Sequence, residues 1–285
     1  MTEVDYGTPE PLEPGVQRLT APNPSAYTAT GTQTYIVGER ELAVIDPGPA
    51  ESAHIEAILR VAAGRTVSTI LCTHTHRDHS PAAVLLKVAT GAAIIGCAAL
   101  SLDDVGPRAD AAFDTDYVPD RVLGDGERVS GDGWTLTAIA TPGHTSNHLA
   151  FQLDGTGALF TGDHVMGFAT SVVSPPDGDM GAYMASLDKL LRRDDRVYYP
   201  GHGPAVTNPQ RLVRGMMGHR KQREGQILRL LRESEADIAG LVARMYVGLD
   251  PRLVGAAGRS VLAHLIDLRA RSLVDGQEHA AWHAR

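Results

Sequence analysis

Three histidines and one aspartate stand within six consecutive positions of this chain, in the stretch Thr73-His74-Thr75-His76-Arg77-Asp78-His79. Imidazole nitrogens and carboxylate oxygens are common ligands of divalent metal ions. The apolar, β-branched run at 67–72 predicts a buried strand before the stretch. Ser80 and Pro81 predict an N-cap and a first helical position after it, opening a helix to about residue 89. We therefore expect the cluster on a loop at the carboxyl end of a strand, where open α/β sheets place their sites.

Four further segments each place a histidine or an aspartate after an apolar run, within a turn that contains glycine. They are Asp46-Pro47-Gly48, Thr141-Pro142-Gly143-His144-Thr145, Gly162-Asp163 and Pro200-Gly201-His202-Gly203. Glycine allows the backbone to turn there without a Cβ clash. With the first cluster, the candidate metal ligands are His74, His76, Asp78, His79, His144, Asp163 and His202. This set is large enough for two adjacent divalent ions.

The order His-x-His-x-Asp-His, Gly-His, Gly-Asp and Gly-His resembles the metallo-β-lactamase-fold hydrolases, over roughly residues 16–206. The resemblance implies an α/β fold, the four-layer αββα sandwich of that superfamily. It also implies how the ligands divide between two ions. One ion would be held by His74, His76 and His144, the other by Asp78, His79 and His202, and Asp163 would bridge both.

Within that superfamily, the beta-lactamase-like protein 2 group is similar in longer motifs. These are Thr-His-x-His-Arg-Asp-His-Ser, Gly-Asp-His-x-Met-Gly, Tyr-Pro-Gly-His-Gly-Pro and the stretch from His219 to Leu228. Enzymes of that group carry a small winged-helix-like domain after the hydrolase domain. The similarity therefore implies a catalytic domain over residues 1–208 and a helical, winged-helix-like domain over residues 209–285.

The chemistry implied by the resemblance is metal-dependent hydrolysis. Two divalent ions, in first place Zn²⁺ with Fe or Mn as alternatives, would hold a bridging hydroxide, because metal coordination lowers the pKa of water from 15.7 toward about 7. Asp78 is the candidate catalytic residue, because it can both ligate a metal and orient the proton of the nucleophile. Asp46 is the candidate hydrogen-bond partner of a ligand imidazole, whose tautomer it would fix.

The substrate is less constrained than the chemistry. A carbonyl substrate, such as a thioester, lactone or β-lactam, either small or carried as an acyl group on a partner, is the first expectation. A single-strand endoribonuclease with the same metal site is the alternative, and a metal-stabilised binding module without catalysis is a third. His219, Arg220 and Arg223 would face the entrance and bind an anionic group of the substrate, although a solvated helix face is the commoner role of such a run.

Charge and composition narrow these choices. Residues 1–215 carry 15 Lys and Arg against 26 Asp and Glu, a net charge of −11, whereas residues 216–285 carry 11 against 8, a net of +3. An acidic catalytic domain argues against a broad nucleic-acid track, because phosphate contacts dominate such binding. No apolar run reaches 18 residues, so no membrane span is expected, and the first residues lack secretory features. Cys72 and Cys97 are expected to be buried free thiols, which fits a cytoplasmic protein.

The remaining pattern predicts the elements around the site. We expect a loose arm over the first fifteen residues, a hairpin-rich sheet over 16–50, and a long loop over 98–120 near the site. Expected helices cover 51–62 with Ser52 as a cap, 181–193, a long helix after Pro209, 236–247 and 259–274, with a wing hairpin over 276–285. His148 is expected to be structural and His164 to be no ligand.

Overall fold

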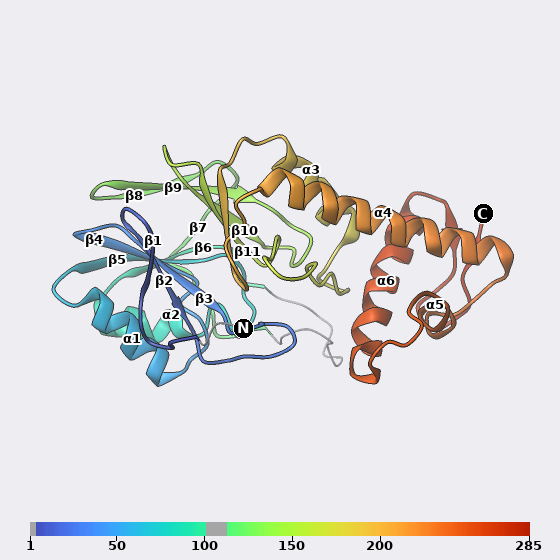
Figure 1. The fold of residues 1–285 in the computed structure, drawn as a ribbon, viewed down its shortest axis with the longest axis horizontal. Helices are drawn as coiled ribbons and strands as arrows, with labels where there is room; N and C mark the ends of the chain where they lie inside the picture. The colour runs from blue at the N-terminus through green and yellow to red at the C-terminus, as the bar shows by residue number, and fades with distance from the viewer. Residues whose placement is uncertain (1–3, 101–112) are drawn as a thin grey trace.

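The computed structural model describes residues 4–100 and 113–285. Two β-sheets face each other, helices cover their outer faces, and a helical C-terminal part extends to one side (Figure 1). This is the predicted four-layer αββα sandwich followed by a winged-helix-like domain, so the predicted fold is confirmed.

The first sheet contains seven strands in sequence order. They are β1 (Glu10–Glu13), β2 (Val16–Thr20), β3 (Gln33–Val37), β4 (Glu41–Ile45), β5 (Thr66–Cys72), β6 (Ala93–Gly96) and β7 (Arg121–Val122). The first four strands pair antiparallel, and β4 to β7 pair parallel. Parallel neighbours need crossover connections, and α1 (Ser52–Ala62) and α2 (Ala82–Thr90) provide them after β4 and β5.

The second sheet has the order β12-β11-β10-β9-β8. Its strands are β8 (Arg128–Gly131), β9 (Trp134–Ala140), β10 (Leu149–Leu153), β11 (Ala158–Gly162) and β12 (Val197–Pro200). Helix α3 (Met180–Leu191) connects β11 to the parallel strand β12, and the side chain of Asp179 caps it by accepting from the Ala182 amide at 2.6 Å.

The two sheets are joined near the ends of β3 and β12. The ring of Tyr35 lies 5.0 Å from that of Phe160 and 5.8 Å from that of Tyr199. The Tyr35 hydroxyl donates to the Pro200 carbonyl at 2.6 Å, and the Gln33 amide donates to the Gly201 carbonyl at 2.8 Å. These bonds fix the carboxyl end of β12 against the first sheet, and the chain continues from there into His202.

The C-terminal part consists of α4 (Pro209–Glu233), α5 (Ile238–Met245), a 3₁₀ turn η1 (Pro251–Leu253), α6 (Val254–Ala270) and the two-stranded pair β13 (Val274–Asp275) and β14 (His283–Ala284). The apolar stripe predicted on the long helix serves two cores. Val213 and Met216 pack in one cluster with α3, whereas Ile227 and Leu231 pack in a second cluster with α5 and α6. One continuous helix thus belongs to both halves of the molecule.

Several local expectations are wrong. The first fifteen residues are not a loose arm throughout, because β1 pairs with β2. Ser80 does not cap α2, since its hydroxyl donates to Asp114 at 2.7 Å and the helix begins at Ala82. Ser52 is the first residue of α1 and not its cap. Helix α6 begins at Val254, five residues before the expected start.

Other expectations stand as follows. Cys72 and Cys97 are buried and unpaired, as predicted. Among the residues that the structure describes, no helix has both the length and the apolarity that crossing a bilayer requires. Of the loop predicted over residues 98–120, residues 101–112 lie outside the described residues; Phe113, just after them, stacks on His76 with ring centroids 5.8 Å apart.

Candidate metal centre

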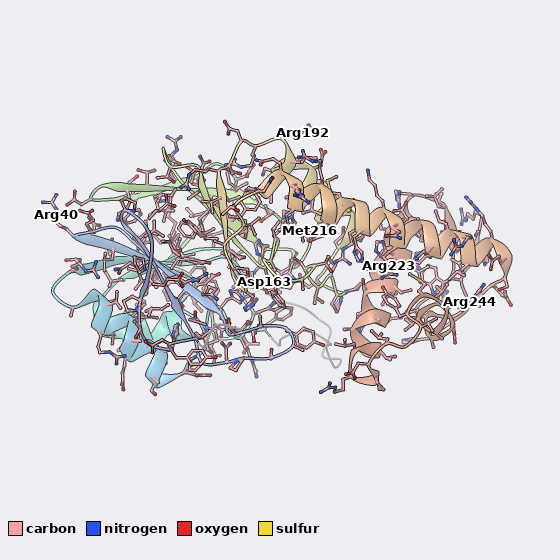
Figure 2. All side chains as sticks on the ribbon, in the orientation of Figure 1. Arg40, Asp163, Arg192, Met216, Arg223 and Arg244 are labelled. Carbon is pink, nitrogen blue, oxygen red and sulfur yellow. The ribbon has the colours of Figure 1, made fainter. Side chains whose placement is uncertain are left out.

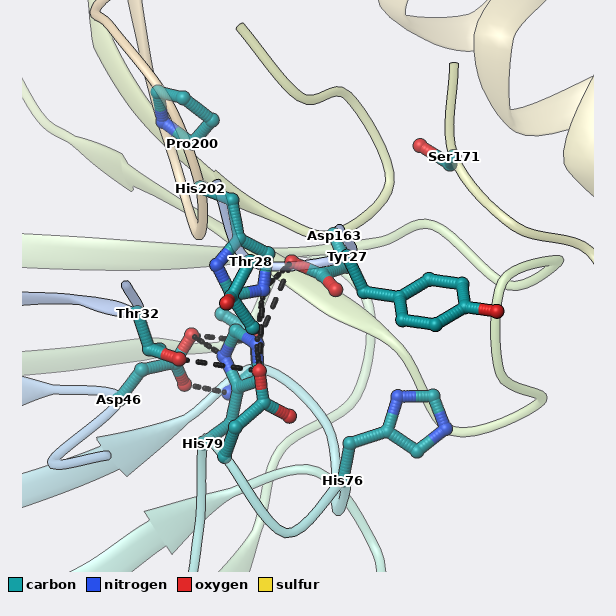
Figure 3. Close-up of polar contacts among 12 residues, drawn as sticks. Tyr27, Thr28, Thr32, Asp46, His76, His79, Asp163, Ser171, Pro200 and His202 are labelled. Carbon is teal, nitrogen blue, oxygen red and sulfur yellow. Dashed lines mark hydrogen bonds and ion pairs between the residues drawn. The ribbon is translucent and has the colours of Figure 1, made fainter. Parts of the chain in front are cut away.

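The seven predicted ligands meet at one edge of the two sheets, each just beyond the carboxyl end of β5, β9, β11 or β12. Figure 3 shows His76, His79, Asp163 and His202 among them. They form two groups: His74, His76, His144 and Asp163, and Asp78, His79 and His202. Within each group the candidate ligand atoms lie within 4.8 Å of one another.

The distances within the groups suit metal coordination. Nδ1 of His76 lies 3.0 Å from Nε2 of His74 and 3.0 Å from Nε2 of His144. In the other group, Nε2 of His79 lies 3.3 Å from Nε2 of His202. Nitrogen lone pairs brought this close need a shared cation or proton between them, because two neutral acceptors would repel.

The Asp163 carboxylate lies between the two groups. Its Oδ1 is 3.3 Å from Nε2 of His202 and 3.4 Å from Nε2 of His79, while its Oδ2 is 3.7 Å from Nε2 of His144. One oxygen therefore faces each group, which is the arrangement that a bridging carboxylate requires. Oδ1 is buried and faces two ring nitrogens, so it is placed to bind a cation together with them.

Hydrogen bonds on the outer side of the rings leave the inner nitrogens free. Nδ1 of His79 donates to Asp46 at 3.0 Å, and Nδ1 of His144 donates to the Val172 carbonyl at 2.6 Å. Nδ1 of His74 lies 2.9 Å from the Thr73 hydroxyl. Because the proton sits on the outer nitrogen in each ring, the lone pair of Nε2 points to the centre.

Asp46 joins two of these rings in one network. Its Oδ1 accepts from the Thr73 amide at 2.7 Å, and its Oδ2 accepts from the Thr73 hydroxyl at 2.8 Å as well as from His79. Because the Thr73 hydroxyl donates its hydrogen bond to Asp46, it can only accept one from Nδ1 of His74. The carboxylate predicted to orient an imidazole thus lies beside His79 directly and reaches His74 through Thr73.

Two backbone features allow the ligands to approach: a left-handed residue, Asp46, and a glycine at position 201, which leaves space for them. Asp46 has a φ of +48°, a left-handed conformation that aspartate tolerates better than most residues. A Cβ on Gly201 would lie 2.5 Å from Oδ1 of Asp163 and 2.7 Å from Cε1 of His79. Glycine is therefore required at position 201, because any side chain would occupy the space of the ligands.

The charges of the centre call for cations. Burial lowers the pKa of His202, but Asp163 and Asp78 outweigh burial and raise this pKa to about 9. Burial likewise opposes ionisation of Asp163, yet His202 and His79 hold its pKa well below the usual range. In contrast, burial and the neighbouring imidazoles hold the pKa of His74 well below its usual value. In this state, protons on imidazoles balance the charge of the buried carboxylates, and other imidazoles beside them are neutral. Divalent ions that bind such donors replace those protons.

The donor set therefore fits two divalent ions. Its members are imidazole nitrogens and carboxylate oxygens with no thiolate, and hydrogen bonds from outside hold the rings of His74, His79 and His144. His148 and His164, also buried, are in neither group. The ring of His164 packs on Tyr183 at 4.7 Å, whereas Nε2 of His148 accepts from the Asp163 amide at 3.1 Å.

A cavity of about 460 Å³ opens onto both ligand groups. Asp78, His144, Asp163 and His202 form its inner end, and Arg77 lines it as well. Its other walls are mostly apolar and come from two loops that are far apart in the sequence: Ala26, Tyr27, Met166, Phe168, Ala169 and Val172. Figure 3 shows Tyr27 beside Asp163 and His76.

The three basic residues expected at the entrance lie on α4 and do not line this cavity. Arg220 is only 4 % exposed, and its guanidinium bonds to the Ser171 carbonyl. Arg223, labelled beneath α4 in Figure 2, packs on the ring of Tyr246 at 4.6 Å and donates to Gln226 at 2.9 Å. His219 accepts from Arg223 at 3.4 Å.

Three polar residues support the ligands, and sequence reasoning missed two of them, Thr73 and Thr32, whereas it identified His148 as structural. Thr73 precedes the first ligand and links it to Asp46, and the Thr32 hydroxyl donates to Asp78 at 3.1 Å. His148 holds the backbone of Asp163. Thr73 begins the first quoted motif and His148 follows His144 by four residues, so their neighbours gave a signal, whereas Thr32 lies 46 residues from Asp78 and gave none.

Comparisons with known proteins agree with this geometry. Residues 27–202 match the family model described as Metallo-beta-lactamase superfamily. Residues 238–282 match the model of the Beta-lactamase associated winged helix domain.

Several curated relatives are about a third identical to this chain over the aligned residues. The lactamase-like protein adaB of Aspergillus niger is 31 % identical over 224 residues, which are 78 % of this chain and 65 % of that protein. An atrochrysone carboxyl ACP thioesterase of Aspergillus fumigatus is 33 % identical over 79 % of this chain and 68 % of its own. The beta-lactamase-like protein 2 homolog of Caenorhabditis elegans is 33 % identical over 79 % of this chain and 74 % of its own. The chain thus spans about two thirds of the length of such relatives.

Solved structures share the fold. A beta-lactamase domain protein from Burkholderia ambifaria superimposes with a TM-score of 0.85 over 100 % of this chain and 95 % of its own, at 19 % identity. TTHA1623, solved in a di-iron-bound form, superimposes with a TM-score of 0.54 over 68 % of this chain and 95 % of its own, at 27 % identity.

Proposed function

This chain belongs to the metallo-β-lactamase superfamily, and we propose that it is a metal-dependent hydrolase of acyl thioesters, either small or bound to a carrier. The observation that carries the proposal is the position of the cavity. Residues of both ligand groups line it, and most of its remaining wall is apolar. An acyl chain can pack on the walls while the carbonyl that it carries lies at the ligands.

We propose two bound divalent ions, with His74, His76 and His144 holding one, Asp78, His79 and His202 the other, and Asp163 between them. Bound there, they would supply a hydroxide at neutral pH and neutralise negative charge that develops on the carbonyl oxygen. Zn²⁺ suits nitrogen and oxygen donors, and Fe is the alternative, since a similar structure is named as di-iron-bound. Metal analysis of the purified protein distinguishes the two.

The residues of the chain orient and shield the reaction. Asp78 lines the cavity, and Thr32 holds its Oδ2, so its carboxylate is placed to accept a proton from the attacking water. The apolar walls exclude water from the acyl group and strengthen the electrostatic interactions at the inner end. His76 and His144 point into the cavity beside the carbonyl position.

The thioester is favoured over other carbonyl substrates by two points. Two relatives that are 33 % identical are named as ACP thioesterases, which act on carrier-bound acyl groups by name. A mostly apolar cavity also suits the acyl chain of a thioester. Arg77 is the only Lys or Arg among the described lining residues, which suits one anionic group and not a track of phosphates.

The test is a panel of substrates on metal-loaded protein. Acyl N-acetylcysteamine thioesters of increasing chain length, a set of lactones, nitrocefin and a short single-stranded RNA are compared at equal enzyme concentration. We expect the highest kcat/KM on thioesters, and the Asp163→Ala variant should lose it. Higher turnover of RNA, falling steeply with added salt, would replace the proposal by a nuclease function. A cytoplasmic location stays a prediction.

A further inference from the structure

One wall of the cavity comes from the connection between β11 and α3. We call residues 165–174 the cavity loop. Met166, Phe168, Ala169, Thr170 and Val172 of this loop line the cavity. The loop has no regular secondary structure, so contacts with other elements must fix its position.

One of these contacts comes from the C-terminal part of the chain. Arg220 of α4 donates through Nη2 to the carbonyl of Ser171 and through Nη1 to the Ser260 hydroxyl of α6 at 3.3 Å. Its guanidinium carbon also lies 5.4 Å from the ring centroid of Tyr183 in α3. A buried guanidinium thus connects α4 and α6 with the cavity loop and α3.

The next carbonyl along the loop serves a metal ligand. The Val172 carbonyl accepts from Nδ1 of His144 at 2.6 Å. Ser171 is also bonded on its side chain, because its hydroxyl donates to the His164 carbonyl at 2.8 Å. Adjacent peptide groups of one loop are therefore held by Arg220 on one side and orient His144 on the other.

We propose that Arg220 is a positioning residue for the metal centre and the acyl cavity. By holding the Ser171 carbonyl it fixes the neighbouring Val172 carbonyl, which sets the tautomer and the ring orientation of His144. The same bond fixes the wall formed by Phe168 and Val172. Arg220 itself touches neither a ligand nor the cavity. The C-terminal domain would then act on the site through this loop and not through direct contact with the substrate.

The part of this proposal that concerns acyl substrates rests on the proposed function, whereas the part that concerns His144 does not. A purely structural role for Arg220, joining two domains, is the competing explanation. The two explanations predict different effects of losing Arg220. A positioning role predicts a change at the cavity loop and at one metal position, whereas a purely structural role predicts a change throughout the fold.

The first measurement uses the metal-free full-length protein and needs no substrate. Hydrogen–deuterium exchange of Arg220→Met, which keeps an apolar stem of similar length, is compared with the wild type. We expect faster exchange in peptides covering 165–174 and unchanged exchange in β9 and β10. Arg271→Met is the matched control, because Arg271 forms ion pairs with Glu224 and Asp267 and not with residues of the cavity loop.

The second measurement follows metal binding. Competition of the Arg220→Met protein with a chelator for Zn²⁺ should show one of the two ions bound about tenfold more weakly, the size expected when a group that orients a ligand is lost. The absorption spectrum of the Co²⁺-loaded protein should change with it, because His144 would be reoriented. Arg220→Lys, which can still donate to the Ser171 carbonyl, should restore most of the affinity.

Ser260→Ala removes only the partner of Nη1 and keeps the test decisive if Arg220→Met does not fold. It should produce a smaller change in the same peptides and in the same ion. Unchanged loop exchange and unchanged Zn²⁺ affinity in the folded variants would overturn the proposal, as would faster exchange spread equally over both sheets. If the wild type did not hydrolyse thioesters, the proposed function would be refuted, but the effects of the Arg220 variants on loop exchange and Zn²⁺ affinity would still stand.

Discussion

The Asp46 carboxylate, one residue beyond β4, accepts a hydrogen bond from Nδ1 of His79 at 3.0 Å. Asp46 comes 33 residues before His79 and belongs to the neighbouring strand of a parallel pair. The ligand loop after β5 is therefore oriented by the end of β4, and the same carboxylate also holds the Thr73 amide and hydroxyl.

We predict that Asp46→Asn weakens metal binding about ten- to a hundredfold while the fold persists. Asparagine tolerates the left-handed backbone at this position, so the variant changes little except the side-chain atoms. Its amide can accept from the Thr73 amide, but its NH₂ then meets the Thr73 hydroxyl and the Nδ1 proton of His79. Chelator competition for Zn²⁺ measures the change. Asp154→Asn, at a half-buried carboxylate on the β10–β11 turn, is the control and should bind Zn²⁺ as the wild type does.

We predict that the wild-type protein binds close to two equivalents of Zn²⁺ and that Asp163→Ala binds one less and loses its activity. The two oxygens of Asp163 face different ligand groups, so its loss removes negative charge from both positions. Elemental analysis after dialysis against Zn²⁺ gives the stoichiometry. A variant that keeps two ions and most of its turnover would show that Asp163 does not bridge them.

We predict that Phe168→Ala raises KM for long-chain thioesters about tenfold and leaves short-chain turnover within about twofold of the wild type. Phe168 lines the cavity and is 41 % exposed, so a long acyl chain would bury its ring further, whereas a short chain would not reach it. Steady-state kinetics over a series of chain lengths tests this. Val88→Ala, on the exposed face of α2, is the control. An equal loss for every chain length would place Phe168 outside the acyl path.

We predict that His54 makes the protein less stable as the pH falls from about 6.5 to about 4. Burial lowers the pKa of His54 to about 4 from 6.5. The Thr34 hydroxyl donates to the Asp46 carbonyl, so Nε2 of His54 must donate to the Thr34 hydroxyl. A second proton on the ring would have to sit on the buried Nδ1, which has no hydrogen-bond partner among the described residues.

The sign follows from linkage. The unfolded chain binds the proton at a higher pH than the folded chain, so the contribution of His54 is complete above about pH 6.5. It is lost toward pH 4, by up to about 3 kcal/mol. Urea unfolding at several pH values measures it, and His54→Gln should lack this component. His279→Gln, at an exposed histidine, should retain it.

The sequence could bring the candidate metal ligands to attention because each stands next to its strand. A strand that ends in Gly-His or Gly-Asp specifies both the residue and its place at the sheet edge, and the structure brings all seven together. The cavity walls could not be predicted in this way. Tyr27 and Phe168 meet only through the packing of two sheets, and no local pattern marks them.

Arg220 shows a different limit of the sequence. Its run of basic residues on a long helix is the pattern of a solvent-facing or ligand-facing surface, but burial depends on what packs against the helix. Here the cavity loop, α3 and α6 all approach the same position. Ser80 illustrates the same point on a smaller scale. Its neighbours in the sequence predict a helix cap, but its hydroxyl donates to Asp114 instead.

Helix α4 contributes Val213 and Met216 to the core of the catalytic half and Ile227 and Leu231 to the core of the C-terminal half. A cut at residue 208 would remove part of the first core together with the second and leave apolar surface of α3 open to water. The shortest fragment that folds alone is therefore expected to keep at least the first turns of α4. Because the connection is a continuous helix and not a flexible segment, the C-terminal half keeps its place beside α3 unless α4 bends or unwinds.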